Sequence, residues 1–370
     1  MECPKIVLDG RLALQSPRRA AGEYAYRLLT ELGFMSRPYD LHIIGDLTAD
    51  PEVLKRMRFI HAVDLLITPN DWVWEQTAFP QAAKGASFVH GLNGLLPMTT
   101  RIPKIVTVHD VAEWHRGRAF EEAVPVTQRP ARAYRMANLR RSVGRAEAVF
   151  TFSEELKSDI GATFGLKDLN TVHVTPLAPT APISEPSFPK EKTVVITASR
   201  SPGQNLHGML ETFAQIADKS WRLTVLAEDR ESAESVRMQG SRMGLGDRVD
   251  IRPAADGEAT TVFQRAGAYL HLPLYEGTSL DVLNAMASGC PVVGSRNAWM
   301  LELMGQGAPL VDARSPEQAA QMLLDIAQNR DCQEALAREN QERVRNLTWK
   351  QTAEQTHQIY LSLLESHHLI

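Results

Sequence analysis

The sequence is poor in the residues that specialised proteins need in abundance. Three cysteines stand in 370 residues, too few and too scattered for a disulfide framework or a paired-cysteine metal site. Hydrophobic residues make up 44%, charged residues 23% and aromatic residues 6%, which excludes a disordered chain and a coiled coil. No apolar run approaches the roughly 18 residues that indicate a membrane-spanning helix. The net charge of −4 argues against general nucleic-acid binding.

Several catalytic signatures are also missing. The sequence has no phosphate-binding Gly-x-x-x-x-Gly-Lys-Ser/Thr loop, no Gly-x-Gly-x-x-Gly after the first expected strand, no Gly-x-Ser-x-Gly and no His-Glu-x-x-His. These absences disfavour ATPases, dinucleotide dehydrogenases, serine hydrolases and zinc peptidases. The first residues lack the charged start, long apolar core and small-residue cleavage site of a secretory signal, so we expect a cytoplasmic protein.

Short, continuously apolar segments alternate with amphipathic ones along most of the chain. Continuous apolar runs are typical of parallel strands covered on both faces, and the alternation predicts doubly wound α/β sheets. We expect strands at 5–8, 41–44, 65–68, 87–90, 104–108, 148–152 and 171–175, then at 193–198, 222–227, 249–252, 268–272 and 292–294. Helices are expected between them, among them 22–32, 154–164, 206–217, 232–243 and 280–287.

A proline-rich segment divides this pattern into two. Five prolines between residues 176 and 190 exclude a helix or a central strand and predict an extended linker. The sequence therefore predicts two Rossmann-like doubly wound parallel-sheet domains, at 1–180 and 181–345, facing a central cleft. A last helix is expected at 346–370, packing back towards the first domain. Ligands of such sheets bind at the carboxyl ends of the strands.

The most informative stretch runs from residue 269 to 293. A strand is followed by a tight loop with Glu276 and Gly277, and Thr278 or Ser279 can cap a helix that begins at Leu280. The N-terminus of that helix offers free backbone N–H groups to an anion. Asn284 lies inside the helix, where its amide could reach another part of the same ligand. The alternative is a capped surface helix with an ordinary loop glutamate.

A second strand–loop–helix unit lies at 193–217. Its loop holds Arg200, whose guanidinium can bind phosphate through two hydrogen bonds, followed by Gly203, Gln204 and Asn205. A surface salt bridge is the alternative role for Arg200. Two such units in one domain favour a nucleotide diphosphate as the ligand.

The first half offers weaker candidates. His109 ends an apolar strand, where it can hydrogen-bond a sugar or serve as a structural residue. Gly22 begins a helix after the first loop. This glycine either allows a ligand to approach the backbone closely or is a simple turn residue. Six arginines lie in the Arg129–Arg145 region, which forms either a solvated helix face or a patch for an anionic surface such as membrane headgroups.

The order and spacing of these motifs resemble those of a known family. The sequence contains Asp9-Gly10-Arg11, Thr107-Val-His109-Asp110, Phe152-Ser153-Glu154, Ser199-Arg200 with Asn205, Gly246-Asp-Arg248-Val249, and Glu276-Gly277 through Ala285-Met-Ala-Ser-Gly289-Cys-Pro291. This pattern resembles the retaining family 4 glycosyltransferases of bacterial group 1 type, which have the GT-B architecture of two Rossmann-like domains. The resemblance runs nearly end to end.

The resemblance implies roles for the candidate residues. Glu276 and His109 correspond to residues at the donor sugar, and we expect them to be the catalytic pair. The donor-binding set implied with them comprises Gly22, Arg200, Gln204, Asn205, Gly277, Thr278, Ser279, Leu280 and Asn284. The family needs no metal or other cofactor, because basic groups and helix ends neutralise the leaving diphosphate.

Two positions depart from the family pattern. Asn284 replaces a glutamate that binds ribose hydroxyls, and Gln204 replaces a lysine that binds phosphate. A neutral hydrogen bond contributes about 1 kcal/mol against roughly 1.5–3 for a charge-assisted one, so donor binding is expected to be weaker unless another group compensates.

Two functions follow from the sequence. The first is transfer of a hexose from a nucleotide diphosphate sugar to a saccharide or lipid-linked saccharide hydroxyl, in cell-surface polysaccharide or glycoconjugate synthesis, with peripheral contact at the inner face of the membrane. The alternative is a non-catalytic partner subunit of an active glycosyltransferase, which the residues at 204 and 284 favour.

Overall fold

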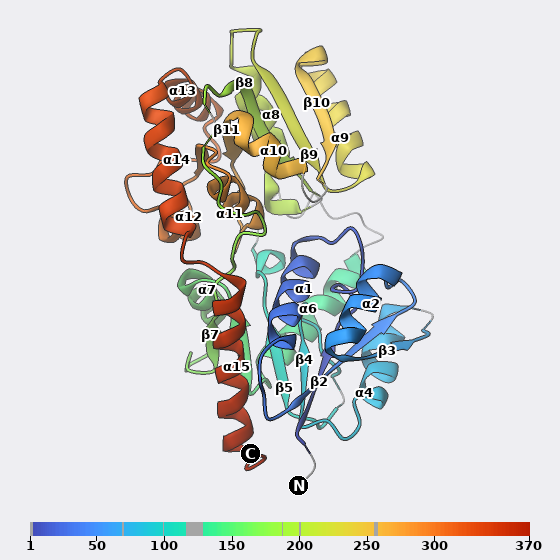
Figure 1. Ribbon diagram of the computed structural model, residues 1–370. Helices are drawn as coiled ribbons and strands as arrows, with labels where there is room; N and C mark the ends of the chain where they lie inside the picture. The colour runs from blue at the N-terminus through green and yellow to red at the C-terminus, as the bar shows by residue number, and fades with distance from the viewer. Residues whose placement is uncertain are drawn as a thin grey trace. The chain divides into compact units, whose positions relative to one another are not determined.

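The computed structural model divides into two compact units (Figure 1). It describes residues 3–68, 70–98, 100–115, 129–186, 188–199, 201–254 and 258–370. Unit 1 comprises the described residues of 1–116, 124–177 and 348–370, and unit 2 those of 178–347. The chain therefore returns to unit 1 for its last helix.

Unit 1 is built on a parallel sheet. In its described part, seven strands follow the order β3-β2-β1-β4-β5-β6-β7, and every neighbouring pair is parallel. The strands are β1 (Lys5–Asp9), β2 (Asp40–Asp46), β3 (Ala62–Leu66), β4 (Phe88–Gly91), β5 (Lys104–Thr107), β6 (Ala148–Thr151) and β7 (Val172–Val174). The central strands β4, β5 and β6 are buried throughout, as their apolar runs predict.

Helices and short turns accompany these strands, and the last of them, α15, comes from the end of the chain. They are α1 (Ala20–Gly33), α2 (Pro51–Ile60), α3 (Asp71–Val73), the π turn η1 (Trp74–Ala78), α4 (Phe79–Ala82), the 3-10 turn η2 (Ala112–Trp114), α6 (Arg129–Val143), α7 (Glu154–Phe164) and α15 (Trp349–Ser366). Helix α7 matches its predicted bounds, and Ser153 caps it by accepting a hydrogen bond from the Leu156 N–H at 3.1 Å.

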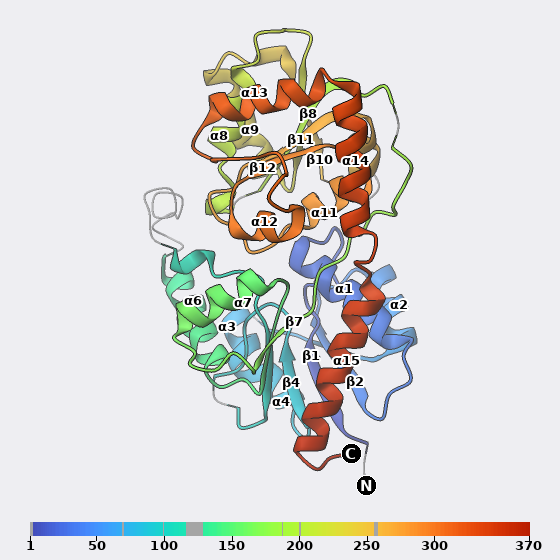
Figure 2. The same ribbon diagram turned by 90° about the vertical axis from the view of Figure 1, so that its left-hand side faces the viewer.

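The last helix is fixed to unit 1 by buried polar contacts. Helix α15 packs along α1, as both views show (Figures 1 and 2). The Tyr360 hydroxyl contacts His90 Nδ1 at 2.5 Å, and the Tyr39 hydroxyl contacts His357 Nδ1 at 2.7 Å. Because Tyr360 and His90 are fully buried, these bonds join the helix to the sheet core.

Unit 2 repeats the architecture with a smaller sheet. In its described part, six parallel strands follow the order β10-β9-β8-β11-β12-β13. They are β8 (Glu191–Ala198), β9 (Arg222–Ala227), β10 (Val249–Pro253), β11 (Ala266–His271), β12 (Val292–Ser295) and β13 (Leu310–Val311). The connecting elements are η4 (Pro202–Gln204), α8 (Leu206–Ala214), α9 (Arg230–Arg242), η5 (Gly246–Arg248), α10 (Glu258–Arg265), α11 (Leu280–Ala287), α12 (Ala298–Met304), α13 (Pro316–Ala327) and α14 (Arg330–Val344).

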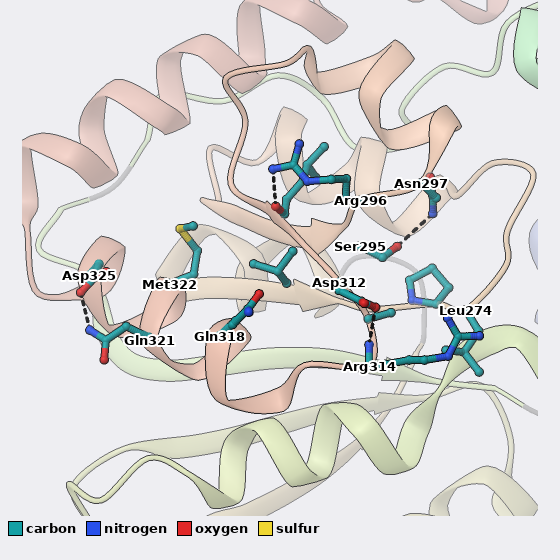
Figure 3. A pocket seen from close by; sticks show the side chains of 14 residues that line it. Leu274, Ser295, Arg296, Asn297, Asp312, Arg314, Gln318, Gln321, Met322 and Asp325 are labelled. Carbon is teal, nitrogen blue, oxygen red and sulfur yellow. Dashed lines mark hydrogen bonds between the residues drawn. The ribbon is translucent and has the colours of Figure 1, made fainter.

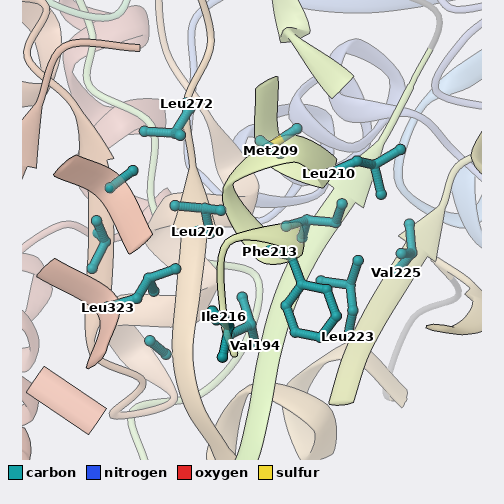
Figure 4. Close-up of a cluster of buried hydrophobic side chains, with 14 of the residues drawn as sticks. Val194, Met209, Leu210, Phe213, Ile216, Leu223, Val225, Leu270, Leu272 and Leu323 are labelled. Atoms are coloured by element: carbon teal, nitrogen blue, oxygen red, sulfur yellow. The ribbon is translucent and has the colours of Figure 1, made fainter. Parts of the chain in front are cut away.

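One apolar cluster forms the core of unit 2 between the sheet and its helices (Figure 4). Phe213 and Ile216, from α8 and the residues after it, pack with Leu223 of β9 and Leu270 of β11. Leu323 of α13 joins them, and all five side chains are at most 3% exposed. Two parallel-sheet α/β domains therefore confirm the predicted fold class.

Several predicted bounds differ from those of the structure, and the third strand and the helix after β8 are two examples. The third strand was expected at 65–68 but lies at Ala62–Leu66, because β3 is an edge strand that pairs with β2 from Ala62 onwards and leaves Ile67 81% exposed. The helix expected at 206–217 ends at Ala214 in α8, three residues early.

The proline-rich segment is extended, as predicted, and is fixed to unit 2. The Ser184 N–H donates to the Ala287 carbonyl at 3.3 Å, and the Gln341 amide donates to the Ser184 carbonyl at 2.5 Å. Lys190 Nζ donates to the Gly289 carbonyl at 3.0 Å. We call residues 178–186 the strap, since they run against α11 and α14 rather than free in solvent.

Candidate functional site

The stretch predicted to be most informative forms a strand–loop–helix unit in unit 2. Strand β11 ends at His271, a loop carries Glu276, and α11 begins at Leu280. Ser279 has an extended backbone, and its Oγ accepts from the Val282 N–H at 3.5 Å. Gly289 ends the turn after the helix with φ of +68°, a left-handed conformation that favours glycine. The sequence thus places Glu276 beside a capped helix N-terminus.

Glu276 is held by a buried histidine that sequence reasoning missed. Glu276 Oε2 contacts His271 Nε2, and His271 Nδ1 lies 3.1 Å from the Tyr269 hydroxyl. That hydroxyl lies 3.0 Å from Thr197 Oγ1, at the end of β8. The side chain of His271 is 4% exposed and that of Glu276 is 28% exposed, so the carboxylate is the member of this chain that solvent or a ligand can reach. The alternation of Tyr269 and His271 on one face of β11 is the signal that could have found it.

Asp281 adds a second carboxylate to this group. Burial raises the pKa of Asp281, and the negative charge of Glu276 raises it further, while the charge of His271 and a hydrogen bond from Thr197 lower it. Burial lowers the pKa of His271, but the charge and hydrogen bond of Glu276 and the charge of Asp281 outweigh it, so the pKa of His271 is raised. The site is therefore a histidine between two carboxylates.

The predicted loop residues after β8 make bonds within the protein. Gln204 Nε2 donates to the Thr197 carbonyl at 3.0 Å, and Gln204 Oε1 accepts from the Ser199 N–H. Asn205 Nδ2 donates to the carbonyls of Leu272 and Ala313, each at 2.9 Å. These two amides therefore fix the loops at the carboxyl ends of β8, β11 and β13. Arg200 lies outside the described residues.

Asn284 is turned to the strap. Its Oδ1 accepts hydrogen bonds from the Thr180 N–H at 2.7 Å, the Thr180 hydroxyl at 3.1 Å and the Ala181 N–H at 3.1 Å. Among the other predicted donor-binding residues on this loop, Gly277 and Leu280 are buried and Thr278 is half-buried. Their contact with a donor stays a prediction.

The two candidates of unit 1 lie at the carboxyl edge of its sheet. His109 Nε2 donates to the Leu92 carbonyl at 2.8 Å, and its ring packs edge-on against Tyr24 with centroids 5.3 Å apart. Burial lowers the pKa of His109, so the ring is neutral at pH 7 and Nδ1 is its acceptor. Gly22 lies in α1, where a Cβ would come within 2.6 Å of the Leu12 carbonyl oxygen, so close packing of helix on loop requires this glycine.

A polar pocket of about 760 Å³ lies in unit 2 at the ends of β12 and β13, and its lining includes Pro273 and Leu274 of the loop that carries Glu276 (Figure 3). Arg296, Arg314, Gln318 and Gln321 contribute its polar lining. Arg296 Nη2 donates to the Leu310 carbonyl at 2.9 Å, which fixes one wall. None of these residues is among those predicted from the sequence. Within the described residues, no group of three or more His, Cys, Asp or Glu side chains could hold a metal ion.

The candidate site of unit 2 falls inside a known family pattern. Residues 191–329 match the family model described as "Glycosyl transferases group 1". The MMP alpha-(1->4)-mannosyltransferase of Mycolicibacterium hassiacum is 24% identical over 272 residues, which is 70% of this chain and 65% of that protein. The chain thus spans slightly less than two thirds of that relative.

Solved structures share the architecture over nearly the whole chain. Sucrose-phosphate synthase from Thermosynechococcus elongatus superposes with a TM-score of 0.76 at 17% identity, covering 98% of this chain and all of that one. Anabaena Alr3699/HepE, solved in complex with UDP and glucose, gives a TM-score of 0.72 at 14% identity, covering 98% of this chain and all of that one. The fold is GT-B, and the similarity to group 1 glycosyltransferases lies in residues 191–329 of unit 2.

Proposed function

We propose that this protein is a retaining glycosyltransferase of family 4. It would transfer a hexose from a nucleotide diphosphate sugar to a hydroxyl of a saccharide or lipid-linked saccharide, in the synthesis of a cell-surface polysaccharide or glycoconjugate. The observation that carries the proposal is the partly exposed Glu276 beside the capped N-terminus of α11, within the residues that match the group 1 family model. The complex of Anabaena Alr3699/HepE with UDP and glucose supports the choice of donor class.

The chemistry needs charge stabilisation at the leaving diphosphate. Glycosyl transfer passes through a cation-like anomeric carbon while negative charge builds on the leaving phosphate oxygen. In this proposal Arg200 and the free N–H groups at the start of α11 bind the diphosphate, and Glu276 holds the donor sugar. For His109 of unit 1, we propose a contact with a sugar through its neutral ring, as the family resemblance implies. No metal takes part, so EDTA is expected to leave turnover unchanged.

We also propose peripheral contact with the inner face of the cell membrane through the Arg129–Arg145 region. Arg140, Arg141 and Arg145 are exposed at and just beyond the end of α6. Burial, and then the charges of Arg145 and Arg141, lower the pKa of Lys104, which indicates concentrated positive charge there. Anionic headgroups would relieve that repulsion. None of the described helices is long and apolar enough to span a membrane.

A second candidate is a non-catalytic partner subunit. The bonds of Gln204 and Asn284 favour it, because both amides are turned to the protein's own backbone rather than left free for a donor. A partner subunit would not be stabilised by any nucleoside diphosphate in a thermal-shift assay, whereas a donor-binding enzyme would be stabilised by mass action.

Calorimetric titration of nucleoside diphosphates tests the proposal. Arg200→Ala is expected to weaken binding about tenfold to a hundredfold, because it removes a charge-assisted hydrogen bond worth roughly 1.5–3 kcal/mol. Arg230→Ala is the matched control, since the Arg230 side chain is 90% exposed and pairs with Glu234. Equal affinity in the parent and in a folded Arg200→Ala variant would show that the diphosphate assignment is wrong.

A further inference from the structure

One face of α13 lines the polar pocket at the ends of β12 and β13. The residues of that face are Gln318, Gln321, Met322 and Asp325, whose spacing of three, four and seven places them on one side of the helix. Leu323, on another side of α13, packs into the core of unit 2. In Figure 3 the end of β12 lies across the hollow from this helix. The volume of about 760 Å³ lies within the roughly 300–1,000 Å³ of small-molecule sites.

Two guanidinium groups line this pocket without a carboxylate partner. Arg296 donates to the Leu310 carbonyl, and within the described residues it makes no ion pair. The side chain of Arg314 is exposed and makes neither a hydrogen bond nor an ion pair in the part of the chain that the structure describes. Each group can therefore donate charge-assisted hydrogen bonds to an anion.

The remaining polar groups suit hydroxyls better than a second anion. Asp312 Oδ1 accepts from the Arg314 N–H at 2.9 Å, and Asp325 Oδ1 accepts from Gln321 Nε2 at 2.7 Å. The lining thus holds two arginines and two aspartates and carries no net charge, so a polyanion would be repelled by the carboxylates. Carboxylate oxygens and the amide of Gln318 are acceptors and donors for hydroxyl groups.

The pocket shares backbone with the loop that carries Glu276. Leu274 and Ala313 both line it. The Leu274 N–H donates to the Gly203 carbonyl at 2.7 Å, and Asn205 Nδ2 donates to the Ala313 carbonyl at 2.9 Å. An occupant of the pocket would therefore contact the loop only two residues before Glu276.

We propose that this pocket is a second ligand site of unit 2, for a small hydroxylated molecule with one anionic group, of which a hexose phosphate is the simplest example. Arg296 and Arg314 bind its phosphate, and Gln318 and Asp325 bind its hydroxyls. The inference goes beyond the proposed function, because it requires neither a nucleotide sugar nor transfer. Any effect of this ligand on nucleotide affinity is reciprocal, since the two bind to one loop.

The first test is calorimetric titration of the full-length protein with glucose 1-phosphate, glucose 6-phosphate and mannose 6-phosphate. Inorganic phosphate and glucose serve as the two halves of the ligand. At least one hexose phosphate is expected to bind more tightly than either half. Absence of binding by all three, or binding of phosphate alone with equal affinity, would overturn the proposal.

Variants then place the ligand in the pocket. Arg314→Gln should weaken binding about tenfold or more, because it removes a charge-assisted hydrogen bond and breaks no bond within the described protein. Gln318→Trp should weaken it as well, by filling the hollow. Arg330→Gln is the matched control, since Arg330 is 68% exposed, pairs with Glu334 and lies outside the lining. Parent affinity in both Arg314→Gln and Gln318→Trp would show that the ligand binds elsewhere.

A competition experiment separates this site from the proposed donor site. A nucleoside diphosphate at saturation should leave the hexose phosphate bound, with at most a changed affinity. Complete displacement would place the hexose phosphate in the donor site and overturn the proposal. Binding that depends on Arg314 in a protein that binds no nucleoside diphosphate would support the second site and contradict only the proposed function.

Discussion

Two buried histidines, one in each unit, both contact a tyrosine hydroxyl, but their pKa values are shifted in opposite directions. His90 of β4 is 0% exposed and contacts the hydroxyls of Tyr360 and Thr107, at 2.5 and 2.9 Å. His271 of β11 is 3% exposed and contacts the Tyr269 hydroxyl and Glu276. Burial alone lowers the pKa of His90 to about 3, whereas the two carboxylates raise the pKa of His271.

The difference shows that neighbouring charge, rather than burial, decides what such a histidine does. His90 is a neutral structural residue that joins α15 to the sheet of unit 1. His271 stands at the edge of a site that the protein leaves partly open. A buried polar group with only hydroxyl partners stabilises a fold, and one with carboxylate partners near the surface is a candidate for function.

The largest effect is expected from breaking the contact of His90 with α15. Tyr360→Ala removes a fully buried ring that packs against Tyr39 and Phe150, so it should lower the free energy of unfolding of unit 1 by about 3–5 kcal/mol. Tyr360→Phe should cost about 1–3 kcal/mol, because it leaves His90 Nδ1 without its partner. Denaturant unfolding measures both, and a loss below 1 kcal/mol in Tyr360→Ala would show that α15 contributes little.

Acid should destabilise unit 1 through its neutral histidines. The pKa of His90 is about 3 and that of His61 about 4, both lowered first by burial from 6.5. Below pH 6.5 these histidines are protonated in the unfolded chain but stay neutral in the folded protein. The free energy of unfolding therefore decreases as pH falls, by about 1.4 kcal/mol per pH unit for each histidine.

For His90 alone this amounts to roughly 2–3 kcal/mol at pH 4.5. His90→Gln should therefore flatten the dependence of unfolding free energy on pH between 6.5 and 4.5 by one proton. An identical slope in parent and variant would mean that His90 titrates normally in the folded protein.

His271 should give the opposite sign. Its folded pKa is raised, so its contribution to stability is present below pH 6.5 and is lost as pH rises through the folded pKa. Stability of unit 2 is expected to fall on the alkaline side of pH 6.5, and His271→Gln should remove that fall. A loss of stability confined to acid pH would place His271 in the same class as His90.

A smaller effect is expected from releasing the strap. Asn284→Ala removes the acceptor of three hydrogen bonds from Thr180 and Ala181 and should cost about 1–2 kcal/mol in unit 2. Asn284→Asp keeps an acceptor and is the control. Equal stability of all three proteins would show that these bonds do not hold the strap.

The smallest effect is expected from Asn284→Glu, which adds a carboxylate to the helix that already carries Asp281. A glutamate can accept ribose hydroxyls, so we predict severalfold tighter binding of a nucleoside diphosphate, reduced by repulsion and desolvation of the added charge. Calorimetry measures the change. Affinity identical to the parent, at unchanged melting temperature, would mean that residue 284 touches no ligand and would favour the partner-subunit alternative.

Most of the fold could be predicted from the sequence, because apolar periodicity and caps act locally. Helix α11 and strand β9 have their predicted bounds, and Ser279 caps α11 as expected. The predicted bounds of β3 were wrong. This edge strand alternates between exposed and buried residues and contains the polar Asp64, so its first residues lack the continuous apolar run that marked the other strands.

The site could be predicted only in part. The loop with Glu276 follows from the motif, whereas the environment of Asn284 does not, because its partners lie 104 and 103 residues away in the chain. Gln204 hydrogen-bonds residues of its own loop and of the preceding strand, which are close in sequence. The family pattern at this position led instead to the prediction of a contact with the donor phosphate. Hydrogen-bond partners that are far apart in the sequence are brought together by tertiary packing, which cannot be predicted from the local pattern of a single sequence.

The most direct test of the account is a screen of nucleotide sugars for hydrolysis without acceptor. The parent protein and His90→Gln are expected to release a nucleoside diphosphate from one class of donor, and Glu276→Gln is expected to lose most of that activity while it stays folded. Absence of release from every donor, with no thermal stabilisation by any nucleoside diphosphate, would contradict the claim that unit 2 binds and activates a nucleotide sugar.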